Sequence, residues 1–211
     1  MPSSSTSSSS SSSSTSPPKL VLFDLDGTLV HAVDKRWGQR IKKPARKANI
    51  RMLETVLVYY RRDATALFQF AQRAGYKIGV ISAGRAEYVH RIVRHLFRGV
   101  RVECILSRDE TMDENGNIHK DLHGVSQLTG VPIESIILFD DLETTQLSKR
   151  AKDIRNNHIR VPMYTGDDND CAVRTMWEIL GHLRTSTNLA KDIGEMRSAR
   201  KRHHTEVFRF L

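Results

Sequence analysis

The sequence predicts an α/β fold of Rossmann-like type, in which helices cover both faces of a parallel sheet. Short runs rich in Val, Ile and Leu recur along the chain, as expected of strands buried on both faces. Helical patterns separate these runs. Polar residues follow several runs directly, beginning with Asp24. In a parallel sheet such residues meet at one edge, which is where open α/β sheets bind ligands.

The composition indicates the number of domains, the kind of partner and the cellular compartment. The chain has 211 residues, which predicts one main domain with tails. Its net charge of +9 favours acidic partners such as nucleic acid or a phosphorylated chain. Cys104 and Cys171 show neither metal-ligand spacing nor a disulfide framework, which favours a reducing compartment, nuclear or cytoplasmic. We expect no membrane span and no secretory signal.

Three regions are expected along the chain. Residues 1–18 are Ser-rich and have no apolar surface to offset the entropy of ordering, so they are predicted to be a disordered tail. Residues 19–187 form the predicted domain. Residues 188–211 are a basic tail, either solvated or acting as an import signal or a nucleic-acid contact.

The first predicted strand, residues 19–24, ends on two carboxylates. Asp24 and Asp26 are one residue apart, so their side chains point the same way along an extended chain. Two such oxygens suit Mg²⁺, and Gly27 lets the backbone turn beside them. The plainer alternative is a simple turn, since Asp and Gly both form turns.

Residues 31–62 are predicted to be a basic insertion that overhangs the edge of the sheet. From His31 to Asn49 the segment is expected to be irregular, either as a surface for a phosphate-rich ligand or as a solvated loop. Lys42 to Lys47 could also act as a nuclear-import signal. The β-branched and aromatic run from Thr55 to Tyr60 predicts a strand, in a hairpin with residues near Ile50 to Leu53.

A helix is expected to start with Asp63 as its N-cap and to end at Gly75. The next strand, residues 77–82, ends on Ser82, and Ala83-Gly84 turns the chain into a helix over 85–97. Ser82 therefore lies just before a helix N-terminus, where backbone N–H groups favour an anion. Ser is also an ordinary cap residue, so this position alone decides little.

The second half of the chain repeats the pattern of a strand that ends on acids. A strand is predicted over 102–106, then an acidic turn with a tight reversal at Asn115-Gly116, and a short helix over 123–129. The strand over 135–140 then ends on Asp140-Asp141. Further elements are predicted to be a helix over 143–153, a strand over 158–161 and a closing helix over 171–183.

These features together resemble the haloacid dehalogenase superfamily. The resemblance rests on Asp24-Leu25-Asp26-Gly27-Thr28, on Ser82 at a strand end, on the later Lys120, and on Asp140-Asp141. It covers about residues 19–183. It implies the superfamily's Rossmann-like fold with a small β-hairpin insertion and no large cap domain.

Within the superfamily, the chain is most similar to the small phosphatases that act on the C-terminal domain of RNA polymerase II. Leu29-Val30-His31, Val58 to Arg62 and Lys120-Asp121-Leu122 carry this similarity. The chain departs from the branch at four places: it has Gly27 for Glu, Asp63 for Pro, Ser82 for Thr, and Asp140-Asp141 for Asp-Asn.

The resemblance implies a Mg²⁺-dependent phosphatase and a role for each site residue. Asp24 is the expected nucleophile, and Asp26 the expected proton donor and acceptor, oriented by Thr28. Ser82, the backbone of Ala83, and Lys120 are expected to hold the phosphoryl oxygens. The implied metal ligands are Asp24, the backbone carbonyl of Asp26, Asp140 and Asp141.

Three functions remain open at this stage. The first is a phosphatase of phosphoserine or phosphothreonine in a protein, acting as a monomer, with polyanion contacts through its basic segments. The second is a phosphatase of nucleic-acid ends or of a small metabolite, which Asp-Leu-Asp-Gly-Thr and the charge also suit. The third is a non-catalytic module that binds a phosphorylated ligand.

Overall fold

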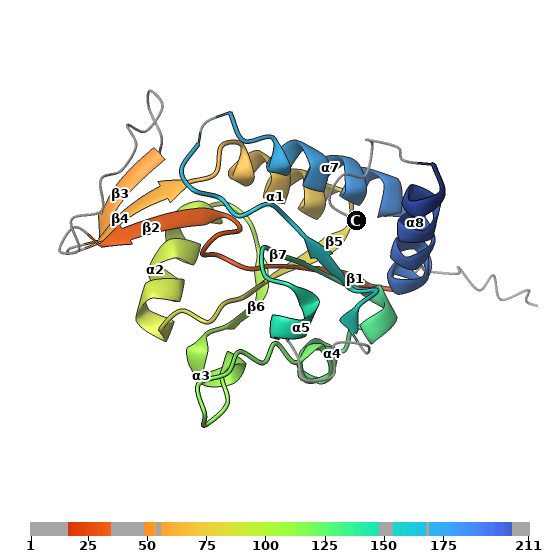
Figure 1. Ribbon diagram of the computed structural model, residues 1–211, viewed down its shortest axis with the longest axis horizontal. Coiled ribbons are helices and arrows are strands. Elements are labelled where there is room, and N and C mark those ends of the chain that lie inside the picture. The colour runs from red at the N-terminus through yellow and green to blue at the C-terminus, as the bar shows by residue number, and fades with distance from the viewer. Residues whose placement is uncertain (1–16, 35–48, 54–55, 148–153, 168, 204–211) are drawn as a thin grey trace, which may run out of the picture.

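The computed structural model describes residues 17–34, 49–53, 56–147, 154–167 and 169–203. At its centre is a five-stranded sheet in the order β6-β5-β1-β7-β8, with every neighbouring pair parallel. The strands are β1 (Lys19–Phe23), β5 (Tyr76–Ile81), β6 (Val102–Leu106), β7 (Ile136–Asp140) and β8 (His158–Arg160). The predicted parallel sheet is confirmed, and the strand that carries Asp24 lies in its middle (Figure 1).

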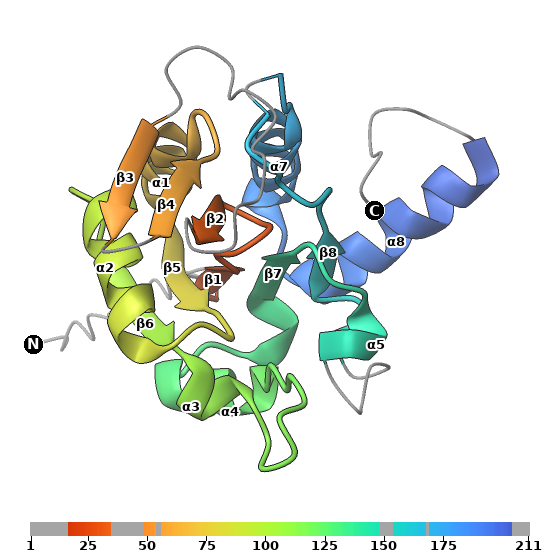
Figure 2. The ribbon, with the colours of Figure 1, turned by 60° about the vertical axis from the view of Figure 1, so that its left-hand side comes forward.

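Helices cover both faces of this sheet, because alternate residues of β1 point to opposite sides. Val21 and Phe23 belong to one buried apolar cluster, and Leu20 and Leu22 to the other. The first cluster takes residues from α1 (Ala64–Arg73), α2 (Ala86–Leu96), α7 (Ala172–His182) and α8 (Leu189–His203). The second takes residues from α4 (Leu122–Thr129) and α5 (Thr144–Leu147), so these helices lie across the sheet from α1 and α7 (Figure 2). Short helical turns complete the fold at α3 (Arg108–Thr111), η2 (Ile133–Ser135) and η3 (Leu183–Thr185).

A separate antiparallel sheet follows β1 and lies beside the sheet edge (Figure 1). Its order is β2-β4-β3, with β2 (Val30–Asp34), β3 (Asn49–Leu53) and β4 (Val56–Tyr60). The expected β3–β4 hairpin is confirmed, with Ile50 opposite Tyr59. The expectation that the chain is irregular from His31 is wrong for residues 31–34, which pair with β4. The rest of the predicted basic loop and import signal, 35–48, lies outside the described residues.

The segment predicted to be a C-terminal tail from residue 188 is a helix over its described part. Leu189, Ile193 and Met196 of α8 are buried in the first apolar cluster. Arg197 donates hydrogen bonds to the carbonyls of Arg155 and His158, which ties α8 to the start of β8. Helix α8 is therefore part of the domain, which extends beyond the predicted boundary at 187.

Two local expectations also need correction or restriction. Asp63 stands at the start of α1 but its side chain makes no capping hydrogen bond, because the residue has a left-handed backbone with φ of 62°. The helix predicted over 143–153 is seen as α5, and residues 148–153 lie outside the described part of the chain. Within the described residues, no helix combines the length and the apolarity that crossing a bilayer requires.

Candidate active site

The two acidic strand ends meet because β1 and β7 are neighbours. The parallel register places Phe23 opposite Phe139, so Asp24 and Asp140 leave adjacent strands at the same edge. The backbone N–H of Asp24 donates to the carbonyl of Phe139 at 3.0 Å, which continues the pairing to the point where the strands end. Both carboxyl groups are buried, at 6% and 0% relative exposure. The fold thus brings together two acids that are more than a hundred residues apart.

Lys120 lies between these two carboxylates. Its Nζ donates to Asp24 Oδ1 at 2.7 Å and to Asp140 Oδ2 at 2.5 Å. The backbone N–H of Lys120 donates to the carbonyl of Leu147 at 2.8 Å, which fixes the loop that carries it. A buried ammonium is tolerated here because two carboxylates compensate its charge.

Asp141 adds a third carboxylate, and the acidic cluster so formed could hold a metal ion. One oxygen from each of Asp24, Asp140 and Asp141 lies within 4.8 Å of the others. Thr28 Oγ1 donates to Asp141 Oδ1 at 3.1 Å and holds that carboxylate in place. When ionised, the three acids and Lys120 leave two negative charges in excess. Oxygen donors with this charge fit a divalent cation such as Mg²⁺.

The protein environment changes the acidity of these groups. Burial raises the pKa of Asp24 to about 8, an effect that the Lys120 ammonium opposes and the Asp140 charge increases. Burial also raises the pKa of Asp141 above its ordinary value. For Lys120, burial alone would lower the pKa, but the two carboxylates hold it above the usual range. Lys120 therefore stays charged, and additional positive charge at the cluster favours the ionised acids.

Asp26 is not one of the three clustered acids, but it lies near enough to Asp24 and Asp141 for their charges to interact. Its residue is exposed, and its Oδ1 accepts a hydrogen bond of 2.6 Å from the hydroxyl of Tyr88 on α2. Surrounding protein raises the pKa of Asp26, and the Tyr88 hydrogen bond opposes this change. Asp26 is thus placed where a proton can pass between the protein and a bound ligand.

Gly27 meets a steric requirement that the sequence did not reveal. Its φ of +80° lies in the left-handed region, and a Cβ at this position would lie 2.5 Å from an Asp141 carboxylate oxygen. Its carbonyl accepts a hydrogen bond of 2.6 Å from the N–H of Tyr164, which also fixes the turn. A residue with a side chain at position 27 would therefore displace Asp141 or the turn itself.

Ser82 follows β5, the neighbour of β1 on the side opposite β7. Its residue is 1% exposed, and its Oγ accepts from the N–H of Gly84 at 3.2 Å, which leaves its hydroxyl proton free to be donated. Arg108 Nε donates to the Ala83 carbonyl at 3.0 Å, and Thr111 Oγ1 donates to the Ser82 carbonyl at 3.0 Å. These two hydrogen bonds fix the backbone of the turn from β5 to α2. A fixed backbone is what an anion-binding loop requires.

Arg61 directly follows β4 and stabilises the backbone around the site. It is 1% exposed and donates to the carbonyls of Thr28 and Pro162, both at 2.7 Å. It also pairs with Asp170 at 3.0 Å and lies over the ring of Tyr164. One buried guanidinium thus joins the turn of the site to the loop that follows β8.

The fold gathers the predicted residues into two groups. Asp24, Lys120, Asp140 and Asp141 form one contact group together with Thr28, while Asp26 contacts Tyr88 instead. Ser82 lies at the end of the strand on the far side of β1. Sequence reasoning gave no role to Tyr88, or to Arg61 beyond the resemblance. The one available signal for Tyr88 was its place in the first turn of the helix after Ser82.

Comparison with protein families identifies the chain. A model of the family described as NLI interacting factor-like phosphatase matches residues 19–192. The chain belongs to this family. It is a phosphatase by family membership, and the predicted resemblance to a phosphatase branch of the haloacid dehalogenase superfamily is confirmed. A search of curated proteins returns no significant match.

Solved structures that align with the chain include other phosphatases. One, of Fcp1, an essential RNA polymerase II CTD phosphatase, aligns at a TM-score of 0.50 and 14% identity over 90% of this chain and 67% of that one. Another, of fission yeast Fcp1-R271A, aligns at 0.42 and 16% over 86% of this chain and 56% of that one. A 3-deoxy-D-manno-octulosonate 8-phosphate phosphatase from Moraxella catarrhalis aligns at 0.45 and 16% over 85% and 93%. This NLI interacting factor-like phosphatase thus shares its fold with Fcp1 and spans about two thirds of that chain.

Proposed function

We propose that this phosphatase is Mg²⁺-dependent, works through an aspartyl-phosphate on Asp24, and acts on phosphoserine or phosphothreonine in proteins. The observation that carries the proposal is the ammonium of Lys120, shared between Asp24 and Asp140 beside a third buried carboxylate. In such a cluster the ammonium and a bound cation would together favour the charged form of the nucleophile, which is what transfer of a phosphoryl group requires.

In the first step Asp24 attacks phosphorus. Its Oδ1 accepts from Lys120, so Oδ2 is the oxygen available to form the new P–O bond. The bond from phosphorus to the leaving oxygen breaks, and Asp26 gives that oxygen its proton. Ser82 and the N–H of Ala83 hold phosphoryl oxygens while the charge moves. A covalent intermediate divides one difficult hydrolysis into two easier steps.

In the second step water attacks the aspartyl-phosphate. Asp26, now ionised, takes a proton from the water as the new P–O bond forms and the bond to Asp24 breaks. The Tyr88 hydrogen bond stabilises the ionised form of Asp26, so it supports this half of the reaction. Both halves use the same exposed carboxyl group, which can exchange protons with solvent.

The acidic cluster suits a resident cation. Asp24, Asp140, Asp141 and the backbone carbonyl of Asp26 would hold it. Mg²⁺, when bound, supplies positive charge that reduces repulsion between the attacking carboxylate and the phosphoryl oxygens. Lys120 carries part of the same task from the protein side, because it compensates Asp24 and Asp140 in the absence of substrate.

The protein substrate is proposed on two grounds. Among the described residues, the chain between β1 and β5 adds the small sheet β2-β4-β3 and the core helix α1 and no large cap domain, which favours access by a polymer. The Fcp1 structures are those of polymerase-tail phosphatases, and one shares the fold of this chain. The proposal further holds that the protein acts as a monomer in the nucleus or cytoplasm.

Phosphate release from an aryl phosphate and from phosphopeptides tests this function. Wild type should turn over both with Mg²⁺ and lose activity in excess chelator. Asp24→Asn should lower kcat by at least about a thousandfold, because it removes the nucleophile. Mass spectrometry of acid-quenched wild type should detect a phosphorylated Asp24. Turnover of the aryl phosphate alone would refute the protein substrate, and full activity of Asp24→Asn would refute the mechanism.

Comparing 5′-phosphorylated oligonucleotides in the same assay separates the nucleic-acid alternative. The proposed function requires a higher kcat/KM for phosphopeptides than for oligonucleotides. A strong preference for oligonucleotides would assign the enzyme to nucleic-acid ends instead. If Asp24→Asn preserves the biological effect while abolishing turnover, the chain acts as a binding module.

A further inference from the structure

The outward face of α2 is strongly basic. His90, Arg91 and Arg94 are exposed along the helix, and Arg98 is exposed just after its end. Glu87 is the one acidic residue between 85 and 101, and it pairs with Arg91 at 2.5 Å. We call these four basic residues the α2 basic face. Its opposite side, with Val89, Ile92 and Leu96, is buried in the core.

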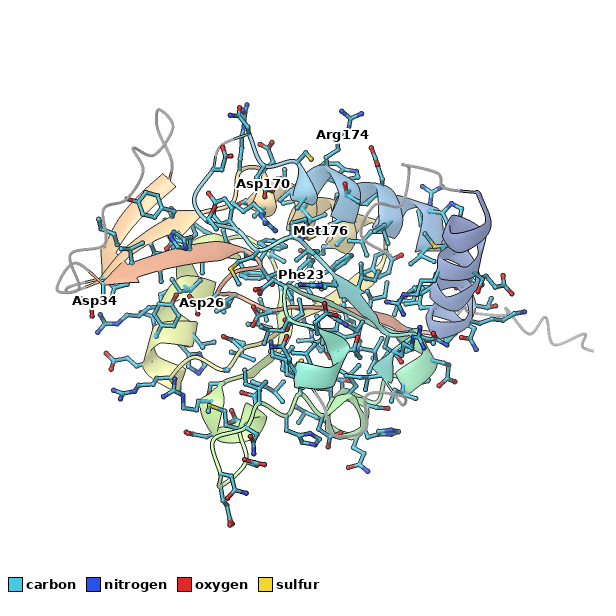
Figure 3. All side chains as sticks on the ribbon, in the orientation of Figure 1. Phe23, Asp26, Asp34, Asp170, Arg174 and Met176 are labelled. Carbon is cyan, nitrogen blue, oxygen red and sulfur yellow. The ribbon has the colours of Figure 1, made fainter. Side chains whose placement is uncertain are left out.

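This basic face borders the candidate active site. Residues three or four apart on a helix lie on the same side, so Arg91 lies one turn beyond Tyr88. Tyr88 contacts Asp26 at 2.6 Å. Figure 3 shows Asp26 close to α2 and the end of β1. A chain that leaves the site past Tyr88 therefore meets Arg91 next, followed by Arg94 and Arg98.

The charge of Arg94 and Arg98 is not compensated within the described part of the chain. Neither side chain forms an ion pair there. In contrast, Arg61 pairs with Asp170, Arg160 with Glu143, and Arg174 with Glu178. Uncompensated arginines next to a phosphate site attract anionic groups and bind phosphates or carboxylates through their planar fork.

A hollow lies next to the end of the basic face. A cavity of about 380 Å³ is lined by Tyr60 of β4, by Thr65 and Gln69 of α1, and by His95 and Leu96 of α2. The rings of Tyr60 and His95 are 4.9 Å apart at its wall. His95 lies two turns from Tyr88 on the same side of the helix. A peptide that follows α2 from the site would thus reach this cavity, which can accommodate one of its side chains.

We propose that the α2 basic face binds the acidic or phosphorylated flank of the same polypeptide whose phosphate enters the site. This inference rests on the proposed protein-phosphatase function and adds the class of sequence that the enzyme prefers. Tyr88 to Arg94 spans about 9 Å and Tyr88 to Arg98 about 15 Å at 1.5 Å per residue. An extended peptide covers those distances in about three to five residues. The preferred acidic positions therefore lie three to five residues from the phosphorylated one.

Steady-state kinetics on matched peptides tests the inference. The substrates carry one phosphoserine and either Glu or a second phosphoserine three to five residues away, on either flank, or Gln at those positions. Wild type should show a kcat/KM about tenfold higher for the acidic peptides, falling as salt rises. The double variant Arg94→Glu/Arg98→Glu should lose this preference and keep its rate on an aryl phosphate.

The control carries the same change of charge far from the site. Arg174→Glu/Lys191→Glu reverses two exposed charges on α7 and α8, and Figure 3 shows Arg174 at the upper edge of the view, apart from Asp26. This control should keep the preference for acidic peptides. If both double variants lose it equally, net charge rather than the α2 basic face explains the effect, and the inference fails.

A binding measurement tests the α2 basic face independently of catalysis. The anisotropy of a fluorescent acidic phosphopeptide is followed with Asp24→Asn, with and without Arg94→Glu/Arg98→Glu. Binding should weaken about tenfold in the triple variant, whether or not peptides are turned over. Equal binding would overturn the inference. It would also be overturned if the charge reversal weakened binding of an oligonucleotide but not of the peptide.

Discussion

At the scale of single residues, Gly27 and Asp141 depend on each other. Asp141 occupies the space that a Cβ at position 27 would need, at 2.5 Å, and Thr28 holds it there. The carboxylate of Asp141 can therefore keep its position only because residue 27 has no side chain. Position 27 is also one of the four places where the sequence departs from the branch that it resembles.

Replacing Gly27 with Ala should reduce activity by more than its loss of folding stability can explain. The left-handed backbone costs about 1–2 kcal/mol in strain, and displacing Asp141 should lower kcat/KM by about ten- to a hundredfold. The matched control is Gly75→Ala, where φ is +88° but nothing lies within 4 Å of the added Cβ. That variant should lose about 1 kcal/mol of unfolding free energy and keep its activity. Similar kinetics for the two variants would contradict the steric explanation.

At the scale of elements, α8 completes the packing of the sheet at the side of β7 and β8. Its Leu189, Ile193 and Met196 fill the first apolar cluster, and Arg197 donates to the carbonyls of Arg155 and His158. Strand β8 has only three residues, so it depends on such support. The helix therefore contributes to the strand pair that carries Asp140.

Removing the buried side chain of Ile193 should destabilise the whole domain. Ile193→Ala leaves a cavity at a site with 0% exposure, which costs about 2–4 kcal/mol of unfolding free energy. For a chain of this size, Tm should fall by about 2–4 °C per kcal/mol. Thermal unfolding followed by circular dichroism measures it. Lys191→Ala, on the exposed side of α8, should leave Tm within about 1 °C.

The elements that the sequence predicted well are those that show one dominant signal. Apolar runs predicted the central strands β1, β5 and β7, because strands buried on both faces have no alternation to misread. Strands β6 and β8 were also predicted, although a charged residue lies in each. Helix α8 was missed because the buried residues among its described side chains, Leu189, Ile193 and Met196, are spread among many charges. Strand β2 was missed because His31 and Asp34 interrupt its pattern. In the site, motif spacing identified the acids, whereas Tyr88 and Arg61 contact it only through tertiary packing.

At the scale of the whole molecule, a buried histidine links stability to pH. His158 on β8 is 1% exposed, and its Nδ1 is 2.8 Å from the Thr144 hydroxyl. Its Nε2 has no hydrogen-bond partner among the described residues. Burial lowers the pKa of His158 to about 4. The folded protein therefore keeps this ring neutral at pH values where the unfolded chain binds a proton.

Acid should accordingly weaken the fold through His158. The unfolded pKa is about 6.5, so stability from this residue is complete above that pH and is lost as pH falls toward 4. The difference of about 2.5 pKa units corresponds to at most about 3 kcal/mol. Urea unfolding at pH 7.5 and 5.0 in chelator should show a smaller pH effect for His158→Gln than for wild type. An identical pH effect in both proteins would contradict this assignment.

The buried guanidinium of Arg61 has a consequence for how the molecule opens. It bonds the turn at Thr28, the loop at Pro162 and the start of α7 through Asp170, while its own strand end leads into α1. Any one of these segments that moved away alone would leave a desolvated charge with fewer partners, which is costly. Partial opening around the nucleophile is therefore disfavoured relative to complete unfolding. Amide protons of the turn after β1 should consequently exchange with solvent about as slowly as those of the central strand.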